Sequence, residues 1–275
     1  RYLMNRRILW DCHMHSSFSA DSPTPMEDMI RQAVFLGLQG ITFTEHLDPD
    51  YPATPDGLDF SLDIPSYQEK LFQLQDTYKD KIQIRFGIEL GLQMHLADYF
   101  HSLMQEFPFD FAIGSSHLVH GFDPYYPEFF QGRKESRCYM EYFESILENL
   151  SCCKDFDVYG HIDYIVRYGS NKNREYSYGR YKDILDEILK KLISMGKGIE
   201  LNTGGYHYGL GEPNPCVGII RRYRELGGEI ITIGADAHTP DKAAYAFDRA
   251  EAVLDRCGFR YYTVFKEHKP EFLPL

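Results

Sequence analysis

The sequence lacks the patterns that mark several large classes of protein. No run of residues is apolar enough to span a membrane, and no hydrophobic signal segment stands at the N-terminus. The six cysteines show no metal-finger spacing, and Cys152 and Cys153 are adjacent. We therefore expect a cytoplasmic protein with reduced thiols and no membrane contact.

Positive charge is also scarce. The chain has 29 Lys and Arg residues against 41 Asp and Glu residues, which gives a formal net charge of −12. A nucleic-acid interface needs clustered Lys and Arg, so we expect no nucleic-acid partner. A small anionic substrate is still compatible with this charge, because bound metal ions can reverse the local field.

Three common catalytic motifs are missing as well. The sequence contains no G-x-S-x-G, no P-loop and no G-x-G-x-x-G. Neither a serine nucleophile nor a dinucleotide cofactor is therefore indicated. The residues that carry chemistry must be sought among the histidines and acids.

Strand-like and helix-like segments alternate along the chain. A hydrophobic content of 43% is typical of a soluble globular protein whose core needs no disulfide cross-links. The predicted strands are 8–11, 40–44, 82–89, 109–114, 158–162, 198–202, 229–234 and about 261–265. The first predicted helix follows Thr24, and the others cover 65–78, 96–106, 132–150, 181–195, 216–226 and 241–257. Thr24-Pro25-Met26-Glu27 reads as a capping box at the start of the first helix.

This alternation predicts a parallel sheet with helices outside it. No linker or internal repeat interrupts the pattern, so we expect a single domain over residues 1–275. A doubly wound open sheet would give the same local pattern. A barrel is favoured because candidate metal ligands follow both the first and the last main strands, which should then be neighbours.

Six of the eleven histidines stand where a strand-like run ends. His13 and His15 are two residues apart, so both side chains leave the same face of a strand, and Asp236 and His238 repeat this spacing. In a parallel barrel, the C-terminal strand ends meet on one face. Nine residues converge there as candidate ligands: His13, His15, Asp21, His46, Glu89, His117, His161, Asp236 and His238.

Nine ligands are too many for one metal ion and suit two or three. Imidazole nitrogen and carboxylate oxygen are ligands that zinc, iron and manganese accept. Glu89 could bridge two ions, and clustered divalent ions generate hydroxide at neutral pH. The other histidines considered, His95, His101, His120 and His268, fall on helices, loops or the tail and are expected to be structural.

These motifs resemble those of the PHP (polymerase and histidinol phosphatase) family, in particular its histidinol-phosphatase branch. The resemblance rests on Asp11 to Ser16, Thr44 to His46, Glu89 with Ser116-His117, and Gly160-His161 with Asp236 to His238. It implies a distorted (β/α)7 TIM-like barrel with the metal site at the C-terminal strand ends. It also implies three metal sites: His13, His15, Glu89 and Asp236; then Glu89, His117 and His161; then Asp21, His46 and His238.

The resemblance further implies a metal-dependent phosphatase that hydrolyses a small phosphomonoester, with L-histidinol phosphate first among the substrates. A metal-bridging hydroxide would attack phosphorus, and the expected catalytic residues are Glu89, Asp236, His238 and Arg167. Arg167 would contact phosphate, because a planar guanidinium matches its oxygens. The branch has a second arginine where this chain has His207, and this departure weakens the assignment of the substrate. Asn202 is a further candidate substrate contact.

Other readings stay open at this point. The protein could hydrolyse a different phosphorylated metabolite or a nucleotide, or it could be a non-catalytic metal-binding module, and it could be a monomer or a small homo-oligomer. The proline-rich stretch from Leu47 to Ile64 is long enough to be a lid, with Asp59 or Phe60 touching substrate. A second wall of the pocket, or alternatively a dimer contact, is expected from Phe122, Tyr125, Tyr126, Phe129 and Phe130.

Overall fold

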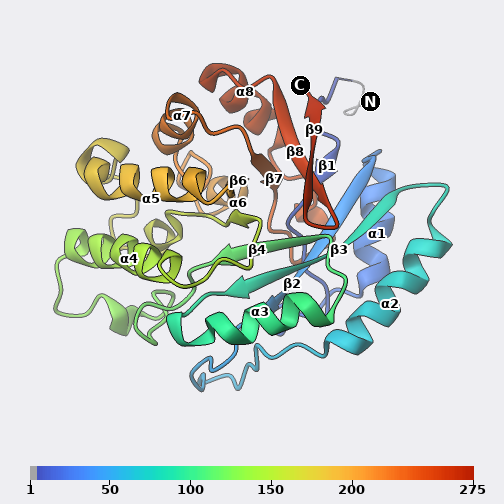
Figure 1. Cartoon of the computed structure of the whole chain (residues 1–275), viewed down its shortest axis with the longest axis horizontal. Helices are drawn as coiled ribbons and strands as arrows, with labels where there is room; N and C mark the ends of the chain where they lie inside the picture. Colours follow the sequence, from blue (N-terminus) through green and yellow to red (C-terminus); the bar gives the residue numbers. More distant parts are fainter. Residues whose placement is uncertain (1–4) are drawn as a thin grey trace.

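Seven parallel strands form the centre of the computed structural model, which describes residues 5–275 (Figure 1). Each strand pairs with the next strand along the chain, so the spatial order follows the sequence order. The strands are β1 (Trp10–Asp11), β2 (Gly40–Leu47), β3 (Gln83–Gly91), β4 (Phe111–Ser115), β5 (Val158–Tyr159), β6 (Gly198–Asn202) and β7 (Ile231–Gly234). All seven overlap predicted strand regions, although β2, β3 and β4 extend beyond the predicted C-terminal ends.

Backbone hydrogen bonds join the first strand to the last and nearly close the sheet. The Cys12 amide donates to the Ile233 carbonyl at 2.9 Å, and the Asp236 amide donates to the His13 carbonyl at 2.9 Å. The backbones approach closely here, because a Cβ on Gly234 would lie 2.3 Å from the Cβ of His13. The expected α/β barrel is therefore confirmed, and the open doubly wound sheet is excluded.

Helices lie between the strands and cover the outside of the barrel (Figure 1). They are α1 (Met26–Phe35), α2 (Ile64–Thr77), α3 (Ala97–Glu106), α4 (Glu135–Leu150), α5 (Lys182–Ser194), α6 (Gly204–His207), α7 (Val217–Glu225) and α8 (Phe247–Cys257). Helix α5 shows why they form: Leu185, Ile188, Leu189 and Leu192 recur at helical spacing and are all buried.

The predicted capping box before α1 is wrong. The helix begins at Met26 with Pro25 at the cap position, and no side chain caps it. The Thr24 hydroxyl instead donates to the carbonyl of His238 at 3.0 Å. Ser22 donates to the same carbonyl at 2.8 Å, so both hydroxyls fasten the loop after β1 to the loop after β7.

The last helix begins six residues later than predicted. A single 3-10 turn, η5 (Pro240–Lys242), comes first, and Ala244 and Ala246 then have positive φ values of 52° and 57°. A carboxylate oxygen of buried Asp11 accepts the Ala244 amide at 2.9 Å and holds this irregular backbone. The helical residue pattern starts at Asp241, but this tertiary contact delays the helix to Phe247.

A hairpin of β8 (Tyr261–Lys266) and β9 (Lys269–Pro274) lies outside the seven-stranded sheet. Its turn contacts the N-terminal ends of the barrel strands, where the His268 amide donates to the Asp110 carbonyl at 2.9 Å. The guanidinium of Arg85 donates to the Phe265 carbonyl at 2.9 Å. The eighth predicted strand is thus present, but it belongs to this hairpin and leaves the barrel with seven.

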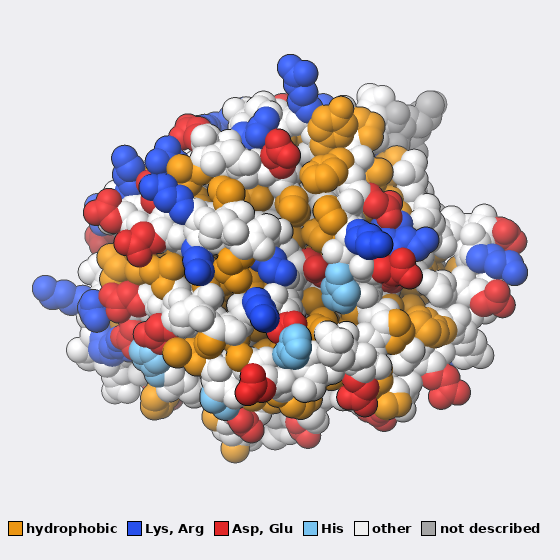
Figure 2. Space-filling model, viewed as in Figure 1, with side chains coloured by type: hydrophobic (Ala, Val, Ile, Leu, Met, Phe, Trp, Pro, Cys, Tyr) orange, Lys and Arg blue, Asp and Glu red, His pale blue; other side chains and the backbone are white. Residues whose placement is uncertain are grey.

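The cysteines, the helices and the surface charge of the described residues bear on the expectations from the sequence. All six cysteines are free. No described helix has both the length and the apolar character that crossing a membrane requires. On the face drawn in Figure 2, basic and acidic side chains are interspersed, and Lys and Arg form no continuous band.

Candidate metal centre and its cavity

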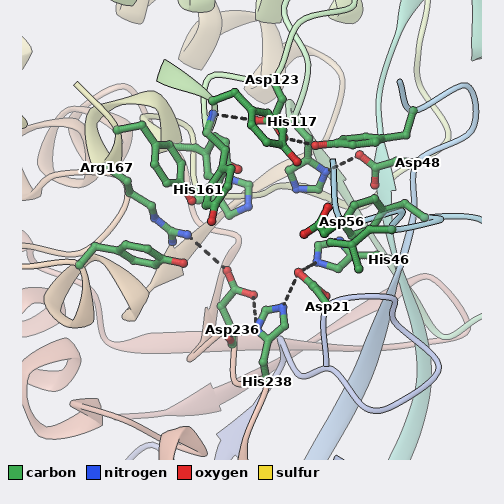
Figure 3. A pocket seen from close by; sticks show the side chains of 18 residues that line it. Asp21, His46, Asp48, Asp56, His117, Asp123, His161, Arg167, Asp236 and His238 are labelled. Carbon is green, nitrogen blue, oxygen red and sulfur yellow. Dashed lines mark hydrogen bonds and ion pairs between the residues drawn. The ribbon is translucent and has the colours of Figure 1, made fainter. Parts of the chain in front are cut away.

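The nine predicted ligands converge at the C-terminal end of the barrel. His46 and Glu89 lie opposite one another in the register of β2 and β3. The others follow the ends of β1, β4, β5 and β7, and all except Asp21 are buried or largely buried. Figure 3 shows His46, His117, His161, Asp236, His238 and Asp21 pointing toward one cavity.

The first predicted ligand set forms a tight cluster. The Nε2 atom of His13 lies 3.2 Å from His15 Nε2, 3.2 Å from Glu89 Oε1 and 3.1 Å from Asp236 Oδ1. The Nε2 atom of His15 lies 3.4 Å from Glu89 Oε1 and 3.2 Å from Asp236 Oδ1. These four side chains are able to hold one ion together.

The two carboxylate oxygens of Glu89 face different groups of histidines. Oε1 lies beside His13 and His15, as described above. Oε2 lies 3.2 Å from the Nε2 atom of His117 and 3.2 Å from the Nε2 atom of His161. A carboxylate placed in this way can bridge two metal ions.

Asp21 joins the third predicted set from a loop. Its Oδ2 atom lies 3.4 Å from His46 Nε2 and 3.2 Å from His238 Nε2. The structure also groups His46 and His117 with buried Asp48, which the sequence did not single out. Asp48 Oδ2 lies 2.8 Å from His117 Nδ1, on the side of the ring away from Glu89.

The geometry of these contacts fits metal ions better than mutual hydrogen bonds. Ligand atoms 2.0–2.1 Å from a tetrahedral zinc ion lie roughly 3.3–3.4 Å from one another, close to the separations above. Several of the buried atoms make no hydrogen bond although a polar atom is near: Asp236 Oδ1, His46 Nδ1 and His238 Nε2. Lone pairs that converge on a common centre explain both observations.

The charges of the cluster also suit a cation. Burial alone would lower the pKa of His13, but Asp236, Glu200 and Glu89 hold it well above its ordinary value. Burial alone would likewise raise the pKa of Glu89, but the neighbouring histidines hold it well below its ordinary value. The acids therefore stay ionised in a buried place and stabilise positive charge there.

Further polar side chains, which the sequence did not single out, contact the histidine rings on the side away from the cluster and orient them. Glu200 Oε2 lies 2.5 Å from His13 Nδ1, and the Ser19 hydroxyl lies 3.0 Å from His15 Nδ1. Each contact fixes which ring nitrogen points toward the cluster. A spacing of two residues at a strand end could have indicated Glu200 and Asp48. Glu200 stands two residues before Asn202, and Asp48 stands two residues after His46. This is the spacing that identified His13 and His15.

Arg167 borders the cavity beside the cluster. It ends the 3-10 turn η3 (Tyr164–Arg167) after β5. Its Nε donates to Asn214 Oδ1 at 2.8 Å, and its Nη1 lies 3.6 Å from Asp236 Oδ2. The guanidinium also lies 4.4 Å from the ring centroid of Tyr208. These contacts hold the planar group in one orientation at the cavity wall.

The other two predicted substrate contacts lie elsewhere. Asn202 is fully buried behind Arg167, where its Oδ1 accepts Arg167 Nη2 at 3.2 Å and its Nδ2 donates to Asp236 Oδ2 at 3.2 Å. His207 is exposed at the end of α6 and lines a second cavity rather than the one that Arg167 lines.

The first cavity has a volume of about 250 Å³. From the long loop after β2, Phe60 lines it, whereas Asp59 does not and instead accepts the Ser61 amide at 2.9 Å. From the aromatic group after β4, Tyr125 and Tyr126 line it, whereas Phe122, Phe129 and Phe130 do not. Both predicted walls are thus present in part.

The histidines set aside in the sequence pair with acids away from the cluster. His95 lies 3.0 Å from Asp50, His101 lies 2.9 Å from Asp155, and His120 lies 3.0 Å from Glu148. His268 pairs with Asp157 beneath the barrel. None of these four histidines lines the first cavity.

Comparison with known proteins gives a family match and close full-length relatives. The model of the PHP domain matches residues 11–204. A histidinol-phosphatase of Lactococcus lactis is 31% identical over 263 residues, which cover 94% of this chain and 95% of that protein. A protein of Clostridium acetobutylicum named "Probable histidinol-phosphatase" is 31% identical over 256 residues, covering 92% of this chain and 95% of its own length.

Solved structures show the same fold. The crystal structure of the Lactococcus lactis histidinol phosphate phosphatase, complexed with zinc, L-histidinol and phosphate, aligns with a TM-score of 0.89 at 31% identity. The alignment covers 96% of this chain and 99% of that one. A structure from Listeria monocytogenes, 18% identical, aligns with a TM-score of 0.75 over 87% of this chain and 99% of that one and shares the fold.

Proposed function

Because the chain belongs to the PHP domain family, we propose that it is a metal-dependent phosphatase that hydrolyses L-histidinol phosphate to L-histidinol and inorganic phosphate. Its relatives with this activity in their names match it over nearly their whole length, so no large part of their fold is missing from it. The reaction would place the protein in histidine biosynthesis.

The charge distribution of the first cavity is the observation that carries this proposal. Arg167 stands on one side, and Asp56 and Asp48 stand on the opposite side, with Asp123 at the rim between them (Figure 3). Histidinol phosphate has a phosphate group at one end and an ammonium group and an imidazole ring toward the other. A cavity with a cation on one side and acids on the other is complementary to such a molecule.

Aromatic side chains also line this cavity. Phe60, Tyr125, Tyr164 and Tyr168 all border the cavity. Tyrosine and phenylalanine faces accept a flat ring by stacking and attract a cation through the ring quadrupole. The walls therefore suit the imidazole ring and the ammonium group of histidinol phosphate better than a simple alkyl phosphate.

We assign the metal ligands as the geometry groups them. One ion would be held by His13, His15, Glu89 and Asp236, a second by Glu89, His117 and His161, and a third by Asp21, His46 and His238. The donors, which are imidazole and carboxylate, suit zinc, iron or manganese. Bound divalent ions lower the pKa of a water molecule to near neutrality and neutralise the charge of a phosphate ester.

The side chains of the protein bind and orient the substrate around these ions. Arg167 would bind phosphoryl oxygens, and its hydrogen bonds to Asn214 and Asn202 hold the guanidinium in place. Asp236 links Arg167 to His13, so the phosphate-binding group and the first ligand set keep a fixed relation. Glu89, Asp236, His238 and Arg167 are the residues that we expect turnover to depend on most.

A substrate panel tests the proposal. Protein reconstituted with Zn²⁺ or Mn²⁺ should hydrolyse L-histidinol phosphate with a higher kcat/KM than p-nitrophenyl phosphate or adenosine monophosphate. The comparison with p-nitrophenyl phosphate measures the contribution of the acidic side of the cavity. A preference for the nucleotide, or no turnover of histidinol phosphate, would overturn the assignment of the substrate.

A further inference from the structure

A second cavity adjoins the first on the other side of the metal cluster. Its volume is about 350 Å³. Four residues border both cavities: Asp21, Tyr208, Asp236 and His238. Two of the three predicted metal sites therefore have ligands that face both spaces, and a group bound at the cluster is open to each of them.

Lys242 is the one lysine or arginine among the described residues that line this second cavity. It ends the turn η5, four residues after the candidate ligand His238. The backbone that presents it is fixed from both sides, because Asp11 accepts the amides of Ala235 at 3.0 Å and Ala244 at 2.9 Å. Lys242 is thus placed by the fold and does not project from a free surface loop.

The charge of Lys242 is only weakly compensated. Its nearest carboxylate is that of Asp241, 3.9 Å away, on a side chain that is 71% exposed. Its ammonium group lies 4.8 Å from the ring centroid of Tyr245, which also lines the cavity. Asp21 and Asp236 also line the cavity, but as candidate metal ligands their charge would be neutralised by the bound ions, which leaves the ammonium group available to an anion.

His207 lies on the same cavity and responds to this lysine. Partial burial comes first and the charge of Lys242 second among the causes that lower the pKa of His207. Its ring centroid lies 6.0 Å from that of Tyr245, so the tyrosine ring lies near both the histidine and the lysine. Near neutral pH, His207 is therefore a neutral hydrogen-bonding group beside one cation.

The first cavity has few cationic side chains of its own. Arg167 is the one cationic side chain, other than histidine, among the described residues that line the first cavity. The metal ions and Arg167 would hold a phosphate ion at the cluster, and Lys242 would add a second cationic side chain from the adjoining cavity. Tyr208 and Asp236, which both contact Arg167, also border the second cavity, so the second cavity begins beside this arginine.

We propose that the second cavity is a subsite for inorganic phosphate, with Lys242 as its cation and His207 as an assisting hydrogen-bonding group. The proposal rests on the proposed function in one respect, that phosphate is the product of the reaction. Phosphate released at the cluster would meet Lys242 in the second cavity, because ligands of the cluster border both cavities.

Binding of inorganic phosphate to the metal-loaded protein tests this subsite directly. Calorimetric titration, without any substrate, should show that Lys242→Met binds phosphate about ten-fold more weakly, which is the effect of losing one charged hydrogen bond. Lys190→Met, on the exposed face of α5, is the matched control and should bind as the unaltered protein does. Lys242→Arg should retain most of the affinity, and His207→Asn should lose less than Lys242→Met.

Product inhibition gives a second readout that separates this subsite from the proposed function. The inhibition constant of phosphate should rise in Lys242→Met by the same factor as the dissociation constant, at a metal content equal to that of the unaltered protein. If Lys242→Met does not load with metal, Lys242→Gln takes its place. Unchanged phosphate affinity in these variants would overturn the subsite even where histidinol phosphate is hydrolysed. Weakened phosphate binding without turnover of histidinol phosphate would uphold the subsite and overturn the substrate.

Discussion

At the scale of single residues, Glu89 joins more of the metal centre than any other side chain described here. Its two oxygens lie 3.1 to 3.4 Å from five histidines, which are drawn from all three ligand sets. It is completely buried, so its charge depends on those neighbours. A change at this one position should therefore disturb two ions together.

Glu89→Gln should abolish turnover and lower the bound metal, while the protein stays folded. The substitution is nearly isosteric, but an amide is a poor bridging ligand because it lacks the negative charge. Steady-state turnover, elemental analysis and thermal unfolding measure the three effects. Glu187→Gln on exposed α5 is the control. Near-normal turnover in a metal-replete Glu89→Gln protein would show that Glu89 is not a bridge.

Arg167→Ala should lower kcat/KM for histidinol phosphate by about one to two orders of magnitude, since a hydrogen bond to a charged group contributes about 1.5–3 kcal/mol. Arg137→Ala, an exposed arginine of α4, should leave kcat/KM unchanged. A silent Arg167→Ala variant would mean that phosphate binds elsewhere.

Asp123→Asn should weaken the preference for histidinol phosphate over p-nitrophenyl phosphate. Asp123 borders the first cavity and accepts the hydroxyl of Tyr51, so its oxygens are positioned there. Removing its charge should raise KM for the cationic substrate and leave KM for p-nitrophenyl phosphate nearly unchanged. Asp59→Asn, at an exposed acid that does not line the cavity, is the matched control. Equal effects on both substrates would remove Asp123 from substrate recognition.

At the scale of elements, the strands were predictable and several of their connections were not. The ligands could be found because a strand end, a residue type and a spacing of two occur together at His13 and His15 and again at Asp236 and His238. Glu200 has the same spacing relative to Asn202. The sequence alone does not distinguish an acid that orients a metal-binding histidine from one in a buried ion pair. The structure does, because it places Glu200 beside His13.

The start of α8 shows what local sequence cannot supply. Residues 241–257 have a helical pattern, yet Ala244 and Ala246 adopt positive φ, which alanine disfavours. The contact that fixes them comes from Asp11, more than two hundred residues away in the sequence. The same contact positions Lys242, so the second cavity could not be predicted before the fold was known.

The β8–β9 hairpin makes a pH-dependent contribution to stability. The hydrogen bond from His268 to Asp157, 2.8 Å long, raises the pKa of His268 above its ordinary value. A raised pKa in the folded state means that the contribution is complete below the unfolded pKa of about 6.5 and is lost as the pH rises through the folded pKa.

His268→Asn should therefore lower Tm more at about pH 5.5 than at about pH 9. Asparagine tolerates the positive φ of 61° at this position, so the backbone itself is not the cause of the loss. Lys269→Gln, the next residue of the hairpin, controls for changes at its surface. Equal destabilisation by His268→Asn at both pH values would rule out the charged pair as the source. Differential scanning calorimetry measures both variants.

At the scale of the whole molecule, one end of the barrel carries the candidate metal centre and the other end is covered by the hairpin. The C-terminal strand ends carry the histidine cluster and both cavities that border it. The N-terminal ends are covered by the hairpin, through Asp110, Asp157 and Arg85. Changes at the hairpin should alter stability with little effect on kcat/KM, and changes at the cluster should do the reverse.

A metal titration tests most directly the claim that the cluster is a multinuclear catalytic site. Protein stripped with a chelator is titrated with Zn²⁺ or Mn²⁺, and phosphate release from L-histidinol phosphate is measured at each ratio of bound metal to chain. Turnover should be absent in the stripped protein and should reach its maximum only when at least two ions are bound per chain. Full turnover without metal, or with a single bound ion, would contradict the account.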